Sequence, residues 1–478
     1  MWFNKNGKTP LLEGDHEEEK SRKKWWDQVI DYKESKEQIV YSLPLVLTNV
    51  FYYLVPLVSV MFAGHLGQLQ LAGATLANSW AYVSGFAFML GLSGALETLC
   101  GQGYGAKLYK MLGIYLQAST IISLIFSIPI SILWYYTEPI LTFLHQSPEI
   151  SKEAATFLRC LIPGLLAFGN IQNILRFLQT QSVVWPAVVC SLVPLILHFG
   201  INYVLVYCTC LGYSGTALAA SITFWISAIM LFVYVHYSKD LKHTWTGFSK
   251  EAFHHVGGNL KLALPSAAMV CFEYWAFEIL VLAGLFPDSE ITTSLIAMCV
   301  NTEAIAFNFT YGLSAAASTR VSNELGAGRS DQAKHAMGVT LKLSIMLTAI
   351  ILLALGFGHD VWAAFFSDST LMMSAFASMT PFVCISIFLD SIQGILSAVC
   401  RGCGWQHLAM YINLGTFYLI GMPIACLLAF RFNLYVKGLW VGLIFGLVSQ
   451  NGSLFLITRL QKWTTIKLSD GEEHPASV

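Results

Sequence analysis

Twelve apolar stretches, each long enough to cross a lipid bilayer as an α-helix, constrain this chain more than any other feature. A bilayer core of ~30 Å is crossed by ~20 helical residues. The stretches lie near 39–62, 70–97, 111–135, 153–179, 186–208, 213–237, 258–285, 291–321, 335–356, 371–399, 407–430 and 438–459. Only 12% of the residues are charged, about half the usual share in a soluble protein. The sequence therefore predicts an all-α membrane protein of twelve transmembrane helices.

The distribution of Lys and Arg predicts the orientation of these helices, because loops rich in both residues stay on the cytosolic side. The expected cytosolic side holds Lys20, Arg22, Lys23, Lys24, Lys107, Lys110, Lys239, Lys242, Lys250, Arg320, Arg329, Lys334, Arg401, Arg459 and Lys462. The other side holds little beyond Lys152, Arg159, Arg431 and Lys437. Both termini are therefore expected in the cytosol, as tails over residues 1–37 and 463–478, and the first segment is not expected to be a cleaved signal peptide.

The chain also repeats itself at an offset of 221 residues. The segment GLSGALETLCGQGYGA begins at Gly91, and GLSAAASTRVSNELGA begins at Gly312. Pro44 and Pro265 occupy the same positions in the two copies. Because the offset covers six spans, the halves should be parallel repeats, an arrangement found in transporters with a site at the repeat interface. We expect two six-helix lobes, at 38–238 and 258–462, joined by a cytosolic linker at 239–257.

Carboxyl groups break this repeat in the second half. Four acids at membrane depth, Glu273, Glu278, Glu303 and Asp390, align with the neutral residues Tyr52, Leu57, Tyr82 and Gly169 of the first half. A carboxylate in hydrocarbon is costly and usually faces a cavity or a partner. The asymmetry therefore predicts that the chemistry of this protein lies in the second lobe.

A carboxyl group that is withdrawn from water holds its proton more firmly, so that it can exchange H⁺ near neutral pH. After releasing the proton it attracts an organic cation, to which Tyr274, Trp275 and Phe277 can offer aromatic faces. The alternative is that the acids pair with basic residues to hold helices together. Few basic residues lie inside the spans, the main ones being Lys342, Arg159 and Arg176.

Helix geometry distinguishes several of these positions. Glu273 and Glu278 are five residues apart and so about 140° apart around a helix, which predicts that only one of them, Glu273, faces a cavity. Glu97 lies at the cytosolic end of its span and is expected to shape the turn that follows. Pro44 and Pro265 interrupt predicted helices, and we expect these bent helices to be hinges.

Five segments in order, MFAGHLGQLQLAGATLANSW, GALETLCGQGYGAK, CFEYWAFEI, STRVSNELGAG and SAVCRGCGWQ, resemble the multidrug and toxic compound extrusion (MATE) family. The likeness is greatest to its plant DETOXIFICATION branch and runs from about residue 36 to 462. It implies two six-helix lobes around a V-shaped cleft. It also implies exchange of substrates for H⁺ or Na⁺.

The resemblance also implies functional residues. Glu273 and Asp390 match acids linked to proton and substrate binding in eukaryotic members, and Glu303 matches a further acid of some members. Some prokaryotic relatives use an aspartate in the first helix. Here residues 39–62 contain no acid, and Asn49 is the only amide. This departure favours coupling in the second lobe, with Asn49 as a substrate-binding candidate of the first.

We therefore expect a secondary antiporter that exports organic, often cationic, small molecules such as plant metabolites and xenobiotics. H⁺ is the expected coupling ion and Na⁺ the alternative, with no cofactor, no metal site and no enzymatic activity. The expected partners are the substrate and membrane lipid, without nucleic acid, and the expected state is a monomer in the plasma or vacuolar membrane.

Three other functions fit a polytopic membrane protein. A flippase for lipid-linked sugars needs Arg and Lys in its cavity for the pyrophosphate, whereas the polar groups identified here are acids. An organic-anion exporter meets the same objection. A membrane sensor or receptor is disfavoured by the near-complete repeat and by the lack of a sizeable soluble domain.

Overall fold

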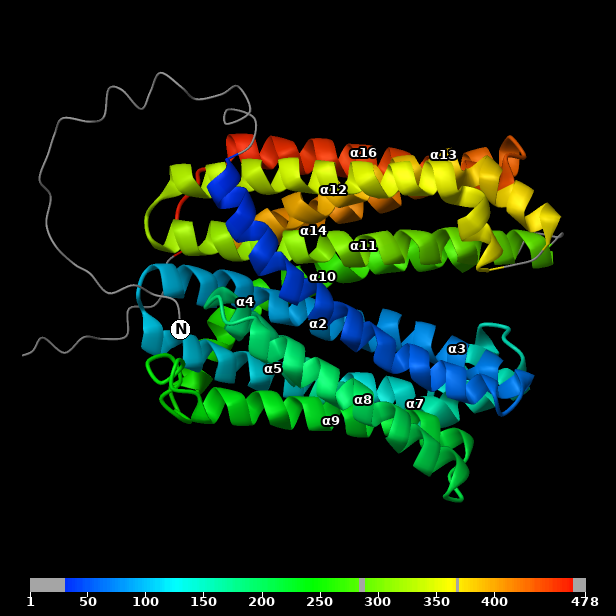
Figure 1. Cartoon of the computed structure of the whole chain (residues 1–478), viewed down its shortest axis with the longest axis horizontal. Helices are drawn as coiled ribbons and strands as arrows, with labels where there is room; N and C mark the ends of the chain where they lie inside the picture. Colours follow the sequence, from blue (N-terminus) through cyan, green and yellow to red (C-terminus); the bar gives the residue numbers. More distant parts are fainter. Residues whose placement is uncertain (1–30, 283–288, 367–368, 467–478) are drawn as a thin grey trace, which may run out of the picture.

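The computed structural model describes residues 31–282, 289–366 and 369–466, which form a bundle of long helices in two lobes (Figure 1). The first lobe holds α2 (Tyr32–Gly64), α3 (Gln68–Ala81), η2 (Tyr82–Phe86), α4 (Ala87–Gly105), α5 (Tyr109–Tyr135), α6 (Thr137–Phe143), α7 (Pro148–Thr180), α8 (Trp185–Tyr207) and α9 (Tyr213–Tyr237). The second holds α10 (Ala252–Leu282), α11 (Ser289–Gly326), α12 (Ser330–Ala364), α13 (Thr370–Cys403), α14 (Gln406–Asn413), η3 (Leu414–Gly421), α15 (Met422–Cys426), η4 (Leu427–Arg431) and α16 (Tyr435–Leu460). The expected all-α fold is confirmed.

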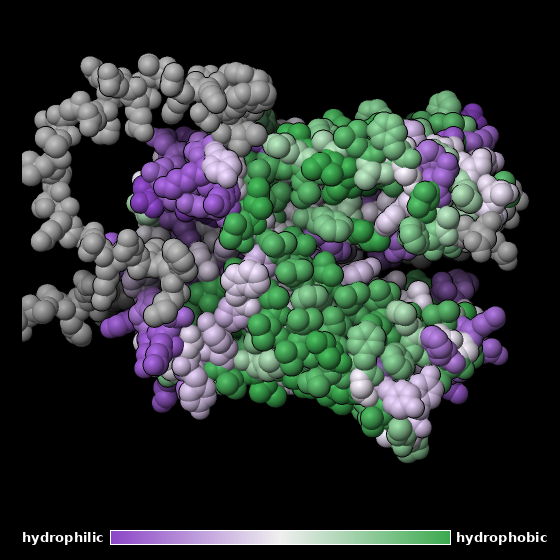
Figure 2. Space-filling model, viewed as in Figure 1, coloured by the Kyte–Doolittle hydropathy of each residue, from purple (hydrophilic) through white to green (hydrophobic). Residues whose placement is uncertain are grey.

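The surface has the polarity of a membrane protein. Hydrophobic residues cover the middle of both lobes, and hydrophilic residues gather at the two ends (Figure 2). Within the described residues, 11 helices are long and apolar enough to cross a bilayer. The 38-residue α11 is outside this set but runs alongside the others in the bundle (Figure 1). It supplies the remaining predicted span.

Several spans contain a wider turn or a proline. The second span is continuous from α3 to α4 through the π-helical η2, and the span from α14 to η4 contains two such segments, η3 and η4. Pro44 lies inside α2, where the Thr48 hydroxyl donates to its carbonyl over 2.9 Å, and Pro265 lies inside α10. Prolines and π-turns leave backbone carbonyls unpaired and bend helices. Whether Pro44 and Pro265 act as hinges stays a prediction.

Each lobe has its own core. Trp134, Phe157, Phe177 and Phe224 are fully buried in the first lobe, and Trp440, Phe376 and Phe417 are fully buried in the second. Ala263 and Ala267 of α10 also pack into the core of the first lobe, so that the two cores meet along this helix.

Close helix contacts join the lobes at the end that carries the α4–α5 and α11–α12 turns, the predicted cytosolic end (Figure 1). A Cβ atom at Gly105 of α4 would clash with the Asn323 carbonyl of α11, and one at Gly326 would clash with the Gln102 carbonyl. Both contact pairs are related by the offset of 221 residues. We call this contact between α4 and α11 the closure seam. The repeated glycine motifs thus close the lobes, whereas a hollow separates the lobes toward the opposite end (Figure 2).

His198 joins three helices of the first lobe. Its imidazole is fully buried, with Nδ1 2.7 Å from the Thr223 hydroxyl and Nε2 3.0 Å from the Val55 carbonyl and 2.8 Å from Asn202. Buried polar groups lose stability when their partner is removed. We therefore expect His198→Leu to destabilise the protein by about 1–3 kcal/mol.

The melting temperature of the purified protein in detergent measures this effect. Tyr203→Leu, at an exposed position of the same helix α8, is the matched control and should melt like the wild type. A His198→Leu protein that melts with the control would show that the network is not stabilising.

Candidate functional site

A central cavity of about 370 Å³ lies between the lobes and is lined by both of them. Its charged side chains are five carboxyl groups and two guanidinium groups: Glu97, Glu273, Glu278, Glu303, Asp390, Arg176 and Arg401. The acids therefore outnumber the bases by three when all are ionised. Such a cavity favours cationic ligands on electrostatic grounds.

Three of the predicted acids gather in the second lobe, each from a different helix. Glu273 of α10 accepts a hydrogen bond of 2.9 Å from the Gln393 amide of α13. Asp390 lies on the same face of α13, three residues before Gln393, and interacts electrostatically with both Glu273 and Glu303. The structure thus brings together the acids that break the repeat.

Glu303 of α11 is the least solvated of the three. Only 4% of its surface is exposed, and neither carboxyl oxygen has a hydrogen-bond partner among the described residues. An ionised carboxylate in such a place is strongly disfavoured unless it is paired. Glu303 is therefore suited to carry a proton or to meet a cation that enters the cavity.

The structure corrects the expectation that Glu273 alone faces the cavity, because Glu278 also lines it. Val270, Tyr274 and Phe277 line the same cavity and fill the arc of α10 between the two acids. The cavity therefore covers about half the circumference of the helix, and an angle of about 140° is accommodated within it. The Tyr274 ring lies 6.4 Å from that of Tyr82 in the first lobe.

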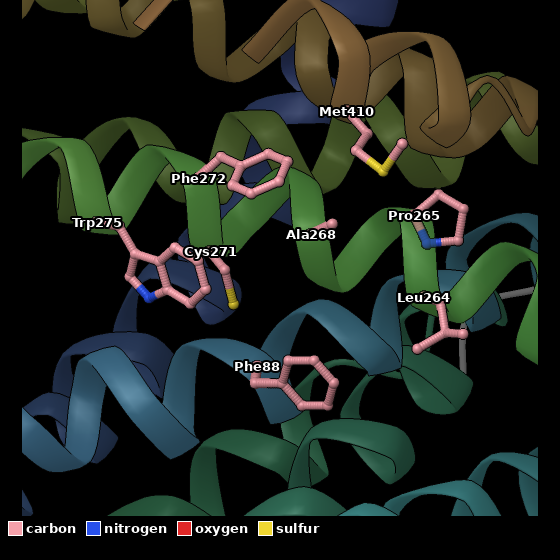
Figure 3. Close-up of a pocket in the computed structure, with 8 residues that line it drawn as sticks. All are labelled: Phe88, Leu264, Pro265, Ala268, Cys271, Phe272, Trp275 and Met410. Carbon is pink, nitrogen blue, oxygen red and sulfur yellow. The ribbon is translucent and has the colours of Figure 1, made fainter. Parts of the chain in front are cut away.

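Trp275 is not a cavity residue, which corrects the prediction that its ring meets the substrate. It lies about 200° around α10 from Glu273 and lines a separate apolar pocket of about 340 Å³ (Figure 3). There it faces outward with Phe272, near Phe88 of α4. Its indole nitrogen donates to the Val83 carbonyl of η2 over 2.9 Å, which ties the lobes together along their outer edge.

Asn49 reaches the cavity from the first lobe, as predicted. Its amide donates to the Asn308 side chain of α11 over 2.6 Å. This hydrogen bond spans the two lobes. Separation of the lobes would therefore break this hydrogen bond and expose the Asn49 amide to the cavity.

Glu97 is also placed differently from the expectation that it shapes a turn. It is buried at the closure seam and forms ion pairs with Arg176 at 3.2 Å and with Arg401 at 3.0 Å. It also accepts from the Ser318 hydroxyl. Glu97 and Arg176 belong to the first lobe and Arg401 and Ser318 to the second. We call Glu97, Arg176 and Arg401 the ion triad, and this triad joins the lobes at the floor of the cavity.

Sequence reasoning missed the arginines of this site. Arg176 was considered only as a partner of the acids, and Arg401 only as a cytosolic loop residue. One signal was present for Arg401, which follows the predicted acid Asp390 by eleven residues, about three whole turns of the same helix. The positions of Gln393 and Tyr311 in the cavity depend on helix rotation, which hydropathy does not specify.

Both lobes of the chain match a known protein family. A model of the MatE family matches residues 44–204 and 265–427 of the chain. The chain belongs to the MATE family. The two matched segments start at Pro44 and Pro265, which confirms the repeat of 221 residues. Membership makes this chain a multi-pass membrane transporter and not an enzyme, as the sequence predicted.

Relatives extend the likeness over nearly the whole chain. Protein DETOXIFICATION 18 of Arabidopsis thaliana is 58% identical over 461 residues, covering 96% of this MATE protein and 98% of the relative. Protein DETOXIFICATION 16 of the same plant is 44% identical over 432 residues, covering 90% and 89%. These relatives confirm the predicted plant branch.

Solved structures agree with the fold. The crystal structure of the eukaryotic MATE transporter AtDTX14 has 34% identity and a TM-score of 0.86, covering 90% of this MATE protein and 96% of that chain. A transporter of the MOP superfamily from Pyrococcus furiosus has 16% identity and a TM-score of 0.78, covering 89% and 95%. At that identity the second likeness concerns the fold alone.

Proposed function

We propose that this MATE protein is a proton-coupled antiporter that exports organic cations. The observation that carries the proposal is the cluster of Glu273, Glu303 and Asp390 around one cavity between two lobes. A carboxyl cluster can bind either protons or an organic cation, since each neutralises the same charge. Competition between the two for one site is the physical requirement of an exchanger.

The lining of the cavity supports a substrate with an apolar body. Tyr52, Tyr82, Phe86, Phe168, Phe277 and Phe307 line it beside the acids. Aromatic faces attract organic cations and also bury apolar groups. The DETOXIFICATION names of the relatives agree with toxic compounds as substrates. Plant metabolites and xenobiotics therefore remain the proposed class.

The arrangement of the lobes supports an outward-facing state. The closure seam and the ion triad close the predicted cytosolic end, and the hollow lies toward the other end. Alternating access then consists of opening this seam while the opposite end closes. The cavity residues are accessible from one side at a time during such a cycle.

A flippase or an anion exporter is supported less well, although the expectation of a cavity without basic residues was wrong. Arg176 and Arg401 do line the cavity, but both form ion pairs with Glu97. Arg176 in addition donates to Gln179 and to Tyr311. An anionic substrate would therefore compete with an existing carboxylate.

A vesicle assay tests the proposal. The purified protein is reconstituted into liposomes with an acidic interior, and uptake of a fluorescent organic cation is followed. We expect the gradient to drive uptake and Glu273→Gln to lower the initial rate by about tenfold or more, because the amide cannot exchange a proton. Glu251→Gln, at an exposed position outside the cavity, is the matched control.

Uptake that ignores both the gradient and the Glu273→Gln substitution would contradict the proposal. Replacing Na⁺ by choline in the same assay separates the two coupling ions. Uptake that follows the Na⁺ gradient and ignores the pH gradient would replace H⁺ by Na⁺ as the coupling ion.

A further inference from the structure

Arg401 lies between two carboxylates that belong to opposite lobes. Its Nε donates to Glu97 of the first lobe over 3.0 Å. It also lines the cavity with Glu273 of its own lobe and interacts electrostatically with that carboxyl group. One guanidinium group therefore interacts with both the closure seam and the proposed proton site.

The two arginines of the ion triad are held unequally. The Arg176 side chain is 5% exposed, and besides Glu97 it contacts Gln179 at 3.0 Å and the Tyr311 hydroxyl at 2.7 Å. The Arg401 side chain is 15% exposed and faces the cavity. Arg176 is thus fixed within the floor of the cavity. Arg401 is the member of the triad that can respond to the charge of Glu273 in the cavity.

A polar stripe on α13 connects the acids to Arg401. Asp390, Gln393, Ser397 and Arg401 follow one another at intervals of three or four residues and all line the cavity. The Gln393 amide donates to Glu273 and to Ser397, each over 2.9 Å. The spacing places these side chains on one face of the helix.

The charges of the ion triad and Glu273 add up to zero only when Glu273 is ionised. Glu97 supplies one negative charge against the two arginines, which leaves one positive charge, and an ionised Glu273 compensates it. Asp390 cannot take this role, since its eleven-residue separation from Arg401 corresponds to about 16 Å along the helix. Two further acids line the cavity: Glu303 on α11, which interacts electrostatically with Asp390, and Glu278, which lies five residues beyond Glu273 on α10.

We propose that Arg401 makes closure of the cytosolic end depend on the charge of Glu273. With Glu273 ionised and the cavity empty, the four groups are neutral together and the closure seam is held. When a proton or an organic cation neutralises Glu273, one uncompensated positive charge remains in a buried contact, which destabilises that contact. The seam then opens, and Arg401 gains water.

This inference rests on the proposed function and gives it a rule for coupling. An exchanger must not change sides while empty and ionised, because such a step would dissipate the gradient. The charge balance at Arg401 holds the seam in that state. It releases the seam in the protonated and cation-loaded states. These are the two states in which the cavity must change from one side of the membrane to the other. Arg401 is therefore a positioning residue, acting through Glu97 and Glu273 without itself carrying the proton.

Hydrogen exchange at the seam tests this role in the full-length protein in detergent. The readout is the protection of the amides of residues 100–106 and 322–328 at pH 5 and pH 8, corrected for the pH dependence of exchange itself. In the wild type we expect about tenfold weaker protection at pH 5, within the usual range of coupling between sites. Adding the fluorescent cation at pH 8 should weaken protection in the same way.

Three variants separate charge from structure. Glu273→Gln, permanently neutral, should give weak protection at both pH values. Arg401→Gln should give the same protection at both pH values, because the charge that responds to Glu273 is gone, while the loss of the ion pair with Glu97 lowers protection equally at both. Arg401→Lys keeps the charge and should restore the pH dependence, which a merely structural role would not produce. Glu251→Gln again serves as the control.

An Arg401→Gln protein that keeps the wild-type pH dependence of protection would overturn the inference. If Arg401→Gln fails to fold, Arg401→Lys still decides, since a folded lysine variant without pH dependence overturns it equally. Failure of the proposed function is a separate result: the wild type would then show no uptake driven by the pH gradient. Uptake that follows the gradient together with an unresponsive seam leaves the function intact and refutes the role of Arg401.

Discussion

Gly326→Ala and Gly105→Ala are each expected to lower transport by about tenfold or more while the protein still inserts and folds. At both positions an added Cβ meets a backbone carbonyl of the other lobe, that of Gln102 or Asn323. Backbone atoms cannot turn aside as a flexible side chain does, so the two helices must separate. Overpacking of this kind costs about 1–3 kcal/mol. Here it destabilises only the conformation in which the seam is closed.

Gly200→Ala in α8 is the matched control, because a Cβ there has no other atom within 4 Å. In a helix this change should be neutral or slightly stabilising. Initial rates of cation uptake, with the quantity of folded protein measured in the same vesicles, provide the comparison. If Gly326→Ala transports as fast as Gly200→Ala, the closure seam does not limit the cycle.

Asp390→Asn is expected to abolish most proton-driven uptake, as Glu273→Gln does, and the double variant should be little slower than the slower single variant. Asp390 and Glu273 interact electrostatically across the same cavity. Residues that serve one site as a unit show strongly non-additive effects. Each single change should reduce the initial rate by about tenfold or more. The reduction in the double variant should be much smaller than the product of the two single reductions.

The control for this cycle is Asp331→Asn, at an exposed carboxylate of the first turn of α12. The measurement is the initial rate of uptake at a fixed pH gradient for the four proteins of the cycle. Effects that multiply would mean that Asp390 and Glu273 act independently, which would contradict a shared site.

The features predicted correctly from sequence are those that are local or periodic. A span shows itself by its length and apolar composition, and the lobes follow from the offset between Gly91 and Gly312. The acids Glu273, Glu303 and Asp390 were identified because a charge in an apolar stretch is conspicuous in any register. Their meeting at one cavity required only that the two halves pack around a common axis.

The predictions that were wrong depend on helix rotation and on contacts between distant helices. Trp275 is two residues from Glu273 in sequence yet faces the opposite side of α10. Glu97 lies at the end of a span, where a turn residue and an interlobe ion pair have the same local sequence. Arg176 and Arg401 join Glu97 only when α4, α7 and α13 meet, which no single segment reveals.

Glu97 and Ser318 are the same position in the two copies of the repeat, and they are hydrogen-bonded to each other. A residue meets its own counterpart only on a two-fold axis. In a dimer of identical half-chains, that axis would hold either two glutamates, which repel, or two serines, which leave the arginines without a counterion. A single chain that carries both halves is free of this constraint. The single carboxylate at the centre of the molecule is therefore a feature that only a chain with two different halves can encode.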